Sequence, residues 1–574
     1  MSAIGIVASV PETRHHFVNA RKRTLTLAKL RLILVLGGFF FVAVCALSRI
    51  AWLGLFAEPP ASSSMAEALL PDRGEIVDRN GVPLARDFHA YALWFNPNAL
   101  EGGPALVKSP AEVAGKIARI VPNLNEAQLR AKLEKGEPVY LSRRILPEQA
   151  NRIHALGEPA LEFPREAERF YPQGSMAAHV LGFVDADERG QVGMEQVFEA
   201  QLTDRIGRGE PAALSIDTRV QGALEDELSR GIALTDAKGA AGIILDVETG
   251  EIIALASLPA FNPNKIDAAG AKNIFNRVTN QVYELGSTFK PITVAAALDA
   301  GSIEHLGQRY QSSRPIEIGG FRIRDSHPIG SSINVPQSLI HSSNIVTAQI
   351  ADDLGGQKLR HTMLSLGMNE RPYVELPARG MPLWPSGDWS RITTMTVSYG
   401  HGVAVTPLHL ASAYAALVNG GVWRPATLRK LAPEDVPKGR RVFKASTSAR
   451  MRQMLRMIVE YGTGKKANAM GFRVGGKTGS AEKPGEGGYR RTSLVSTFAA
   501  AFPMDRPRYV IISMLDEPKG TAATSGQRTA SWNAAPVVGR VVPRIGPLLG
   551  IMPDETRDID ISDLKPLIPG ESKS

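Results

Sequence analysis

The feature that most constrains this chain is an uncharged apolar run near its N-terminus. Residues 32–48, LILVLGGFFFVAVCALS, contain no charged side chain, and Arg31 and Arg49 stand at the two ends. The run approaches the about 20 residues that a helix needs to cross a bilayer, and arginine side chains can reach the headgroups from its ends. A cleaved signal peptide would have a shorter apolar core, followed by a small-residue cleavage site. We therefore predict one uncleaved transmembrane anchor over residues 32–56.

Positive charge before the apolar run predicts its orientation. Residues 1–31 form a basic arm with six Lys and Arg side chains and one acidic side chain, Glu12. Because basic flanks stay inside, we expect the arm in the cytoplasm and the main body outside the membrane. The arm contributes +5 of the chain's net charge of +9, and its place beside a membrane explains this charge without a nucleic-acid partner.

The external body is long enough for two domains, since single cores stop growing at about 250–300 residues. Residues 58–208 begin with the linker EPPASSS, carry a hairpin signal at Asn80-Gly81 and predict a non-catalytic pedestal. Residues 209–545 change to two β-rich runs joined by a turn, followed by helical patterns, which predicts an α/β (α+β) domain. Residues 546–574 are rich in Asp and Pro and predict a flexible tail.

Cysteine and histidine usage argues against metal and redox chemistry. The one cysteine, Cys45, lies in the apolar run, so no intramolecular disulfide or cysteine metal site can form. The histidines show no His-Glu-x-x-His pattern, and His401, between two glycines, is interpreted as structural. We predict no metal and no cofactor.

The first candidate catalytic residues along the chain lie in STFKPITVAAALDAG, residues 287–301. It reads as a helix with Ser287 as N-cap and Gly301 as its end. Ser287 and Lys290 are three residues apart and therefore share one face. A serine hydroxyl needs a base to become a nucleophile, and a desolvated lysine can supply one. Such a two-residue pattern is expected about once by chance in a chain of this length, so it needs support.

Two further boxes supply that support. Ser342-Ser343-Asn344 stands at the entrance of a predicted helix with Ile345, Ile350 and Leu354 on its buried face, where an ordinary helix cap is the alternative. Lys477-Thr478-Gly479-Ser480 lies in GFRVGGKTGS, residues 471–480, which also matches a nucleotide-binding P-loop.

The P-loop interpretation fails on its surroundings. A P-loop needs a buried strand before Gly471 and a helix from Lys477, but a helix and a polar loop precede it and GSAEKPGEGGYRR follows. Phe472 and Val474, on either side of Arg473, instead predict an edge strand over 472–474, with 495–503 and 509–517 as antiparallel neighbours. We expect no nucleotide binding, and we expect Lys477 to bind a carboxylate.

The order Ser-x-x-Lys, Ser-x-Asn, Lys-Thr-Gly resembles the motif set of penicillin-binding proteins and serine β-lactamases. RGEIVDRNGVPLA (73–85) and SYGHGVAVTPLHLASAYAALVNGG (398–421) resemble boxes of class B penicillin-binding proteins, and residues 496–518 most resemble the division-specific FtsI type. The match covers nearly all of residues 73–540. It implies a β-lactamase-like transpeptidase domain over 209–545, with an antiparallel sheet flanked by helices, and a dimerisation-like pedestal.

The resemblance implies a peptidoglycan D,D-transpeptidase that cross-links stem peptides of the septal wall and releases D-alanine. Ser287 would attack the D-alanyl carbonyl and Lys290 would take its proton. Ser342 would relay a proton to the leaving amine, and Asn344 would hold Lys290 and the substrate amide.

The third box would bind the substrate's terminal carboxylate through Lys477, Thr478 and Ser480, with Gly479 between them. The backbone N–H groups of Ser287 and Ser480 would form the oxyanion hole. Family members commonly carry Thr where Ser480 stands and Pro where Leu285 stands; neither change removes a reacting group, and we expect at most tuned β-lactam affinity.

The implied partners are stem peptides, the lipid-linked precursor, β-lactams, the membrane and division-complex proteins including a glycosyltransferase. Alternatives remain open: an elongation-specific class B enzyme, a D,D-carboxypeptidase, a non-catalytic division scaffold or a β-lactam sensor. A class A β-lactamase would need a Glu-x-x-x-Asn box, and none lies between Asn344 and Lys477.

Overall fold

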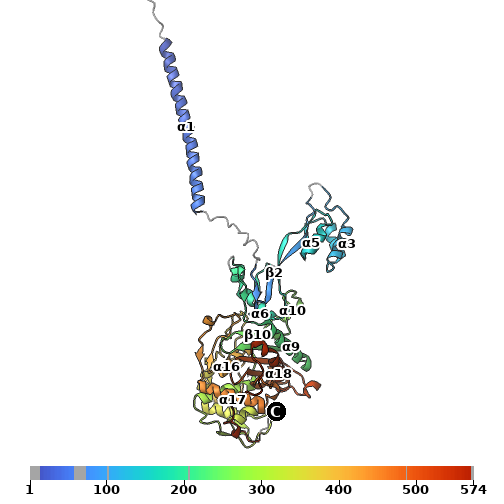
Figure 1. The fold of residues 1–574 in the computed structure, drawn as a ribbon, viewed down its shortest axis with the longest axis vertical. Coiled ribbons are helices and arrows are strands. Elements are labelled where there is room, and N and C mark those ends of the chain that lie inside the picture. The colour runs from blue at the N-terminus through green and yellow to red at the C-terminus, as the bar shows by residue number, and fades with distance from the viewer. Residues whose placement is uncertain are drawn as a thin grey trace, which may run out of the picture. The chain divides into compact units, whose positions relative to one another are not determined.

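The computed structural model describes residues 13–56, 73–99, 103–185, 187–204, 207–485 and 488–570. The chain separates into two units, residues 1–70 and 71–574 (Figure 1). The first twelve residues of the basic arm, the linker EPPASSS and residues 571–574 of the tail lie outside the described residues.

The first unit contains one long helix, α1 (Thr13–Phe56). Its segment Leu25–Arg49 is long and apolar enough to cross a membrane, with a mean hydropathy of 2.5. The side chains of residues 25–49 are exposed throughout, as expected for a surface that faces lipid. The helix starts well before the predicted anchor because the basic arm continues it without a helix breaker.

The pedestal is built on a six-stranded sheet around a long central strand. The predicted hairpin at Asn80-Gly81 is confirmed, since it joins β1 (Ile76–Val77) to β2 (Pro83–Phe95) and Gly81 takes a φ of +84°. The other strands are β3 (Val139–Ile145), β4 (Leu161–Glu162), β5 (Arg165–Phe170) and β8 (Ala212–Ala213), in the order β3-β2-β1-β8 with β4 and β5 also paired to β2.

Short helices complete the pedestal. Helices α3 (Pro110–Ile120) and α4 (Glu126–Glu134) form a separate small core with α5 (Pro147–His154). The remaining elements are α6 (Ala178–Leu181), β6 (Phe183–Val184), β7 (Gly190–Val192), α7 (Gly193–Val197) and α8 (Glu199–Thr203).

A buried charged network, which we name the pedestal network, fastens the start of the pedestal to helix α7. Glu195 accepts from Arg73 Nε at 2.8 Å and from Arg169 Nε at 2.7 Å, and Arg169 also contacts Asp87 at 3.0 Å. None of these four side chains is more than 2% exposed. Each buried charge therefore has an opposite charge at hydrogen-bonding distance, which is what allows charges to be buried.

The second domain is centred on a five-stranded antiparallel sheet in the order β10-β9-β19-β18-β17. Its strands are β9 (Gly239–Asp246), β10 (Ile252–Leu258), β17 (Gly475–Gly485), β18 (Gly488–Phe502) and β19 (Tyr509–Asp516). The predicted edge strand and its two antiparallel neighbours are confirmed as β17, β18 and β19. The edge strand begins at Gly475 rather than at 472, because Arg473 takes a left-handed φ of +53° that interrupts extended backbone.

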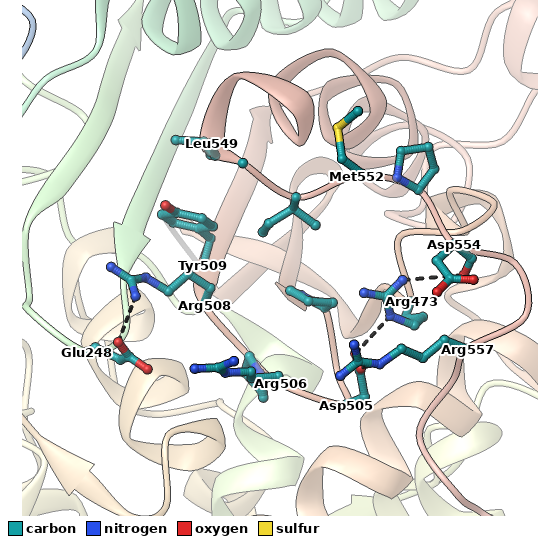
Figure 2. Close-up of a pocket in the computed structure, with 15 residues that line it drawn as sticks. Glu248, Arg473, Asp505, Arg506, Arg508, Tyr509, Leu549, Met552, Asp554 and Arg557 are labelled. Atoms are coloured by element: carbon teal, nitrogen blue, oxygen red, sulfur yellow. Dashed lines mark hydrogen bonds and ion pairs between the residues drawn. The ribbon is translucent and has the colours of Figure 1, made fainter.

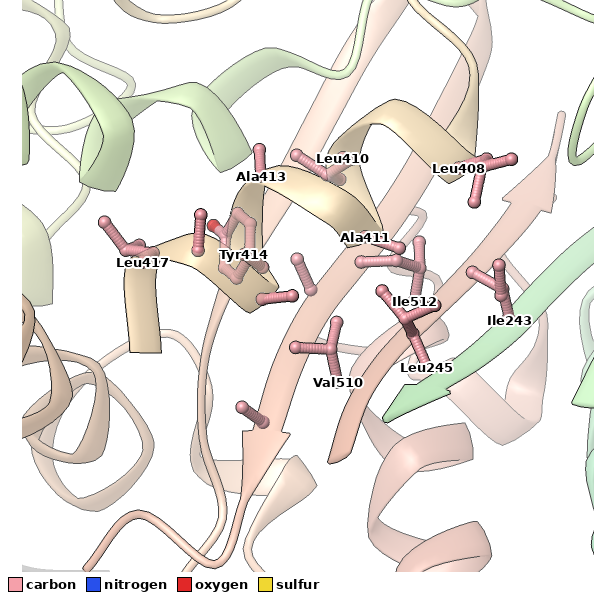
Figure 3. Packing of buried hydrophobic residues seen from close by; sticks show 14 of the residues in the cluster. Ile243, Leu245, Leu408, Leu410, Ala411, Ala413, Tyr414, Leu417, Val510 and Ile512 are labelled. Atoms are coloured by element: carbon pink, nitrogen blue, oxygen red, sulfur yellow. The ribbon is translucent and has the colours of Figure 1, made fainter. Parts of the chain in front are cut away.

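Helices cover both faces of this sheet. Val510 and Ile512 of β19 face α16 (Pro407–Val418), which Figure 3 shows packed on the strand through Ala411 and Tyr414. Ile511, which alternates with them, faces the opposite layer formed by α9 (Thr218–Thr235) and α18 (Ala534–Ile545). The apolar run of β19 is therefore explained by burial on both faces.

A helical region lies beside the sheet and carries the first two boxes. Its members are the 3-10 turn η2 (Gly286–Phe289), α11 (Lys290–Asp299), α12 (Val335–Ile340), α13 (Asn344–Leu354), α14 (Gly356–Ser365), α15 (Arg391–Ser398) and α17 (Ala445–Tyr461). Short strand pairs accompany them: β11 (Arg309–Gln311) with β14 (Ser332–Asn334), β12 (Ile316–Ile318) with β13 (Phe321–Ile323), and β15 (Val422–Trp423) with β16 (Arg440–Arg441). Helix α10 (Ala268–Lys272) lies instead near α6, where His179 Nε2 is 2.7 Å from Asn273 O.

The predicted flexible tail differs from the structure over residues 546–570. Ile561, Leu564 and Ile568 are buried in the main core, and Asn334 Nδ2 donates to Leu567 O at 2.6 Å. Residues 549–554 line a pocket with the β18–β19 turn, where Arg473 pairs with Asp505 at 2.8 Å (Figure 2). Composition missed this packing because a few apolar residues spaced along an acidic segment are enough to dock it.

Candidate active site

The turn that carries Ser287 is fixed by hydrogen bonds within the chain around it. Ser287 lies inside η2, half-buried, rather than at a helix N-cap as predicted; α11 begins only at Lys290, whose N–H donates to Ser287 O. The 3-10 turn forms because Thr288 Oγ1 binds Leu285 O at 2.9 Å, which tightens the chain before Pro291. The predicted end of the helix is confirmed at Gly301, with a φ of +72°.

Gly400 packs closely against the same turn. Gly286 N donates to Gly400 O at 3.3 Å, and a Cβ on Gly400 would lie 2.2 Å from Gly286 O. Tyr414 OH donates to Thr288 O at 2.8 Å, from within the core. Ser287 is therefore presented on a rigid support.

Lys290 is fully buried one turn beyond Ser287 and points to the second box. Its Nζ donates to Ser342 O and, at 3.1 Å, to Ser342 Oγ. Burial lowers the pKa of Lys290 to about 7, although the nearby carboxylate of Asp325 opposes the shift. A lysine with this pKa is neutral in a large fraction of molecules at neutral pH and can accept a proton.

Lys477 reaches the same hydroxyl from the edge strand. Its Nζ donates to Ser342 Oγ at 2.9 Å and to Thr478 O at 3.1 Å. Burial, and then the charge of Lys290, lower the pKa of Lys477 well below its usual range. Two buried lysines thus converge on one hydroxyl oxygen, an arrangement that can pass a proton between Lys290, Ser342 and a bound group.

The backbone of Ser342 is strained. It joins α12 to α13 with a left-handed φ of +62°, a conformation that costs a non-glycine residue about 1–3 kcal/mol. Lys290 binds both its carbonyl and its hydroxyl, which helps to hold this conformation. Strain retained at the meeting point of two lysines is typical of a functional position.

Asn344 opens helix α13, as predicted, with Ser343 as the N-cap that accepts from Val346 N at 3.1 Å. The predicted buried face is confirmed, because Ile345, Ile350 and Leu354 are all buried. The side chain of Asn344 donates through Nδ2 to Arg324 O at 3.0 Å, whereas the sequence predicts a contact with Lys290.

The third box lies on β17 next to η2. Lys477 and Thr478 sit within the strand, whereas a P-loop would place them at the start of a helix. A Cβ on Gly479 would lie 2.3 Å from Leu285 O, so the glycine lets the strand approach the nucleophile's turn. Ser480 Oγ accepts from Ala530 N at 3.0 Å, which leaves its own proton free to be donated to an anion.

Sequence reasoning missed two residues that support these boxes. Thr463, after the end of α17, shares a 2.7 Å hydrogen bond between its Oγ1 and Thr478 Oγ1. Asp325 contacts the start of α13. Neither belongs to a motif, and only the tertiary fold brings them to the site. Within the described ranges, no group of three or more His, Cys, Asp and Glu side chains could hold a metal ion.

Comparisons with known proteins agree with this arrangement. The model of the penicillin-binding protein transpeptidase domain matches residues 240–538, and that of the penicillin-binding protein dimerisation domain matches residues 68–212. The chain is 38% identical to the probable peptidoglycan D,D-transpeptidase FtsI of Caulobacter vibrioides, covering 95% of this chain and 93% of the relative. It is 30% identical to the peptidoglycan D,D-transpeptidase FtsI of Escherichia coli K12, covering 91% and 92%.

A solved structure shows the same fold. The crystal structure of penicillin binding protein 3 from Mycobacterium tuberculosis, complexed with aztreonam, superposes with a TM-score of 0.66 at 25% sequence identity. The superposition covers 86% of this chain and 99% of the other.

Proposed function

Because the chain belongs to the class B penicillin-binding proteins and is a peptidoglycan D,D-transpeptidase of the FtsI type, we propose that it cross-links the septal wall through an acyl-enzyme on Ser287. The observation that carries the site assignment is the convergence of Lys290 and Lys477 on Ser342 Oγ, beside the turn that presents Ser287.

In the first half-reaction, neutral Lys290 takes the proton of Ser287 Oγ as that oxygen attacks the carbonyl between the two D-alanines. The backbone N–H groups of Ser287 and Ser480 stabilise the oxyanion. A proton then passes from Lys290 through Ser342 to the leaving amine, the C–N bond breaks and D-alanine departs. Lys290 is thereby neutral again.

Substrate binding is assigned to the third box and to Asn344. Lys477, Thr478 and Ser480 bind the terminal carboxylate, and Asn344 binds the substrate amide after releasing Arg324 O. In the second half-reaction, an amine of a neighbouring stem peptide attacks the ester carbonyl and Ser287 recovers its proton through Lys290. The product is a cross-link.

Labelling with fluorescent penicillin tests this assignment. Full-length protein in detergent should form a covalent adduct, peptide mass spectrometry should place it on Ser287, and Ser287→Ala should abolish it. An adduct that persists in Ser287→Ala would refute the mechanism. Product analysis with a stem-peptide donor and an acceptor amine separates a transpeptidase, which forms the cross-linked dimer, from a carboxypeptidase, which forms only the hydrolysed peptide.

We further assign the protein to cell division, as a single-pass protein of the inner membrane with its basic arm in the cytoplasm and residues 209–545 as the periplasmic catalytic domain. The name FtsI of two relatives and the apolar segment Leu25–Arg49 support this. Its partners would be lipid-linked precursor, a glycosyltransferase and other division proteins. Depletion should give filaments with blocked septa; swollen cells that still divide would instead indicate an elongation-specific enzyme.

A further inference from the structure

We propose that Asp325 is a positioning residue of the reaction, which fixes the start of helix α13 and supplies a negative charge near Lys290. This inference rests on the proposed function of Ser287 and Lys290. It concerns a carboxylate outside the three boxes, delivered to the site by the β12–β13 hairpin.

The carboxylate of Asp325 is bound by three consecutive residues of the second box's helix. Oδ1 accepts from Asn344 N at 2.5 Å and from Ile345 N at 3.1 Å, and Oδ2 accepts from Ser343 Oγ at 2.7 Å. The first N–H groups of a helix have no partner within it, and their dipoles favour a negative charge. Asp325 therefore acts as an external cap that sets where α13 begins.

The backbone next to Asp325 holds the side chain of the same box. Arg324 O accepts from Asn344 Nδ2 at 3.0 Å. The segment is itself fixed, because Ile323 at the end of β13 is buried with Ala348 of α13 and Met395 of α15. Residues 324 and 325 thus hold both the backbone and the side chain of Asn344 before substrate arrives.

The charge of Lys290 lowers the pKa of two neighbouring groups, whereas the carboxylate of Asp325 raises the pKa of Lys290 itself. Lys477 approaches from β17, His401 from the loop after α15, and Asp325 from the hairpin. Burial, and then the charge of Lys290, lower the pKa of His401 to about 4, so it is neutral above about pH 5. The pKa of Lys477 is also lowered, and Asp325 is the acidic group whose charge acts on Lys290.

Burial and Asp325 shift the pKa of Lys290 in opposite directions. Burial lowers the pKa of Lys290 and Asp325 raises it, and the balance is about 7. A base is most effective when its pKa lies near the working pH, because a lower pKa gives a weaker proton acceptor. Removal of the negative charge should therefore keep Lys290 neutral at lower pH and make it a weaker base.

The experiment is the pH profile of penicillin acylation, measured as the second-order rate constant between pH 5 and 9 on full-length protein in detergent. The wild-type rate should fall on the acid side with a midpoint near pH 7. Asp325→Asn preserves the shape of the cap but removes its charge, so the midpoint should move to lower pH by at least about half a unit. The plateau rate should fall about tenfold, because Asn344 is held less firmly. Asp325→Ser, another capping residue without charge, should shift the midpoint in the same direction and serves if the first variant does not fold.

Two controls separate charge from structure. Asp352→Asn removes a carboxylate of α13, the helix that Asp325 caps. Asp352 pairs with Arg391 at 2.5 Å, and its replacement should leave the midpoint unchanged. Asp325→Glu keeps the charge and should keep the midpoint, even if its plateau rate is lower. The proposal is wrong if the uncharged Asp325 variants keep the wild-type midpoint, or if Asp352→Asn shifts it equally. A wild-type protein that is not acylated on Ser287 would instead refute the proposed function.

Discussion

The pedestal network and the active site are both buried clusters of charged side chains, but they balance charge in opposite ways. In the pedestal network, Arg73 and Arg169 each contact the carboxylate of Glu195 within 2.8 Å. In the active site, Lys290 and Lys477 are equally buried and instead meet at the hydroxyl of Ser342.

The difference separates a structural cluster from a reactive one. A buried ion pair recovers much of the desolvation cost of its two charges, so its members stay charged and hold segments together. Lysines without a carboxylate in direct contact do not recover that cost, and their pKa values fall. Burial without a paired carboxylate lowers the pKa of Lys290, which suits it to the proposed role of base.

The largest expected effect comes from removing the proposed base, Lys290. Lys290→Met should reduce the second-order rate constant of penicillin acylation by about 10²- to 10⁴-fold, the usual contribution of a positioned general base. The melting temperature should change little, because an apolar side chain of similar length avoids the cost of burying an ammonium. Acylation kinetics and thermal melting of the same sample measure both effects.

Lys519→Met is the matched control for this variant. Lys519 is exposed and pairs with Asp236 on the surface, so its loss should affect neither the rate nor the melting temperature. A Lys290→Met protein that melts far below wild type would contradict the comparison, since the lysine would then be a structural charge.

The reverse test removes a charge from the pedestal network. Glu195→Gln leaves Arg73 and Arg169 buried without their shared carboxylate, and should lower the free energy of unfolding by about 3–5 kcal/mol. The acylation rate per folded molecule should be unchanged, because this cluster contributes no group to the reaction. Denaturant unfolding of full-length protein, with active-site titration of the folded fraction, separates the two quantities.

Glu134→Gln, in the same pedestal, provides the control. Glu134 forms an exposed pair with Arg130, and solvent screens such a pair, so its loss should have little effect on the free energy of unfolding. If Glu134→Gln and Glu195→Gln lowered the free energy of unfolding equally, burial would not distinguish the pedestal network from a surface pair.

The sequence predicts the proposed reacting groups more readily than the residues that support them. Ser287, Lys290 and Lys477 were identifiable because short polar boxes interrupt helix starts and a strand edge, where patterning is strong. The strained φ of Ser342 is held by Lys290, and the turn at Ser287 is packed against Gly400; both are long-range contacts that no local pattern encodes. The same holds for Asp325, which a hairpin brings to a helix that starts 19 residues later.

The smallest test concerns a neutral contact at the edge of the reactive cluster. Thr463 Oγ1 lies 2.7 Å from Thr478 Oγ1, which also lies 3.4 Å from Lys477 Nζ, so the Thr463 hydroxyl orients a group assigned to the substrate carboxylate. A neutral hydrogen bond contributes about 1 kcal/mol, and Thr463→Val should therefore lower the acylation rate constant about fivefold. Thr463→Ser keeps the hydroxyl and should restore most of the rate. Because no buried charge is involved, the acid midpoint of the pH profile should stay near that of the wild type in both variants. A shift of the midpoint in Thr463→Val would mean that this hydroxyl helps to set the charge of the two lysines, and that the reactive cluster extends beyond Ser342.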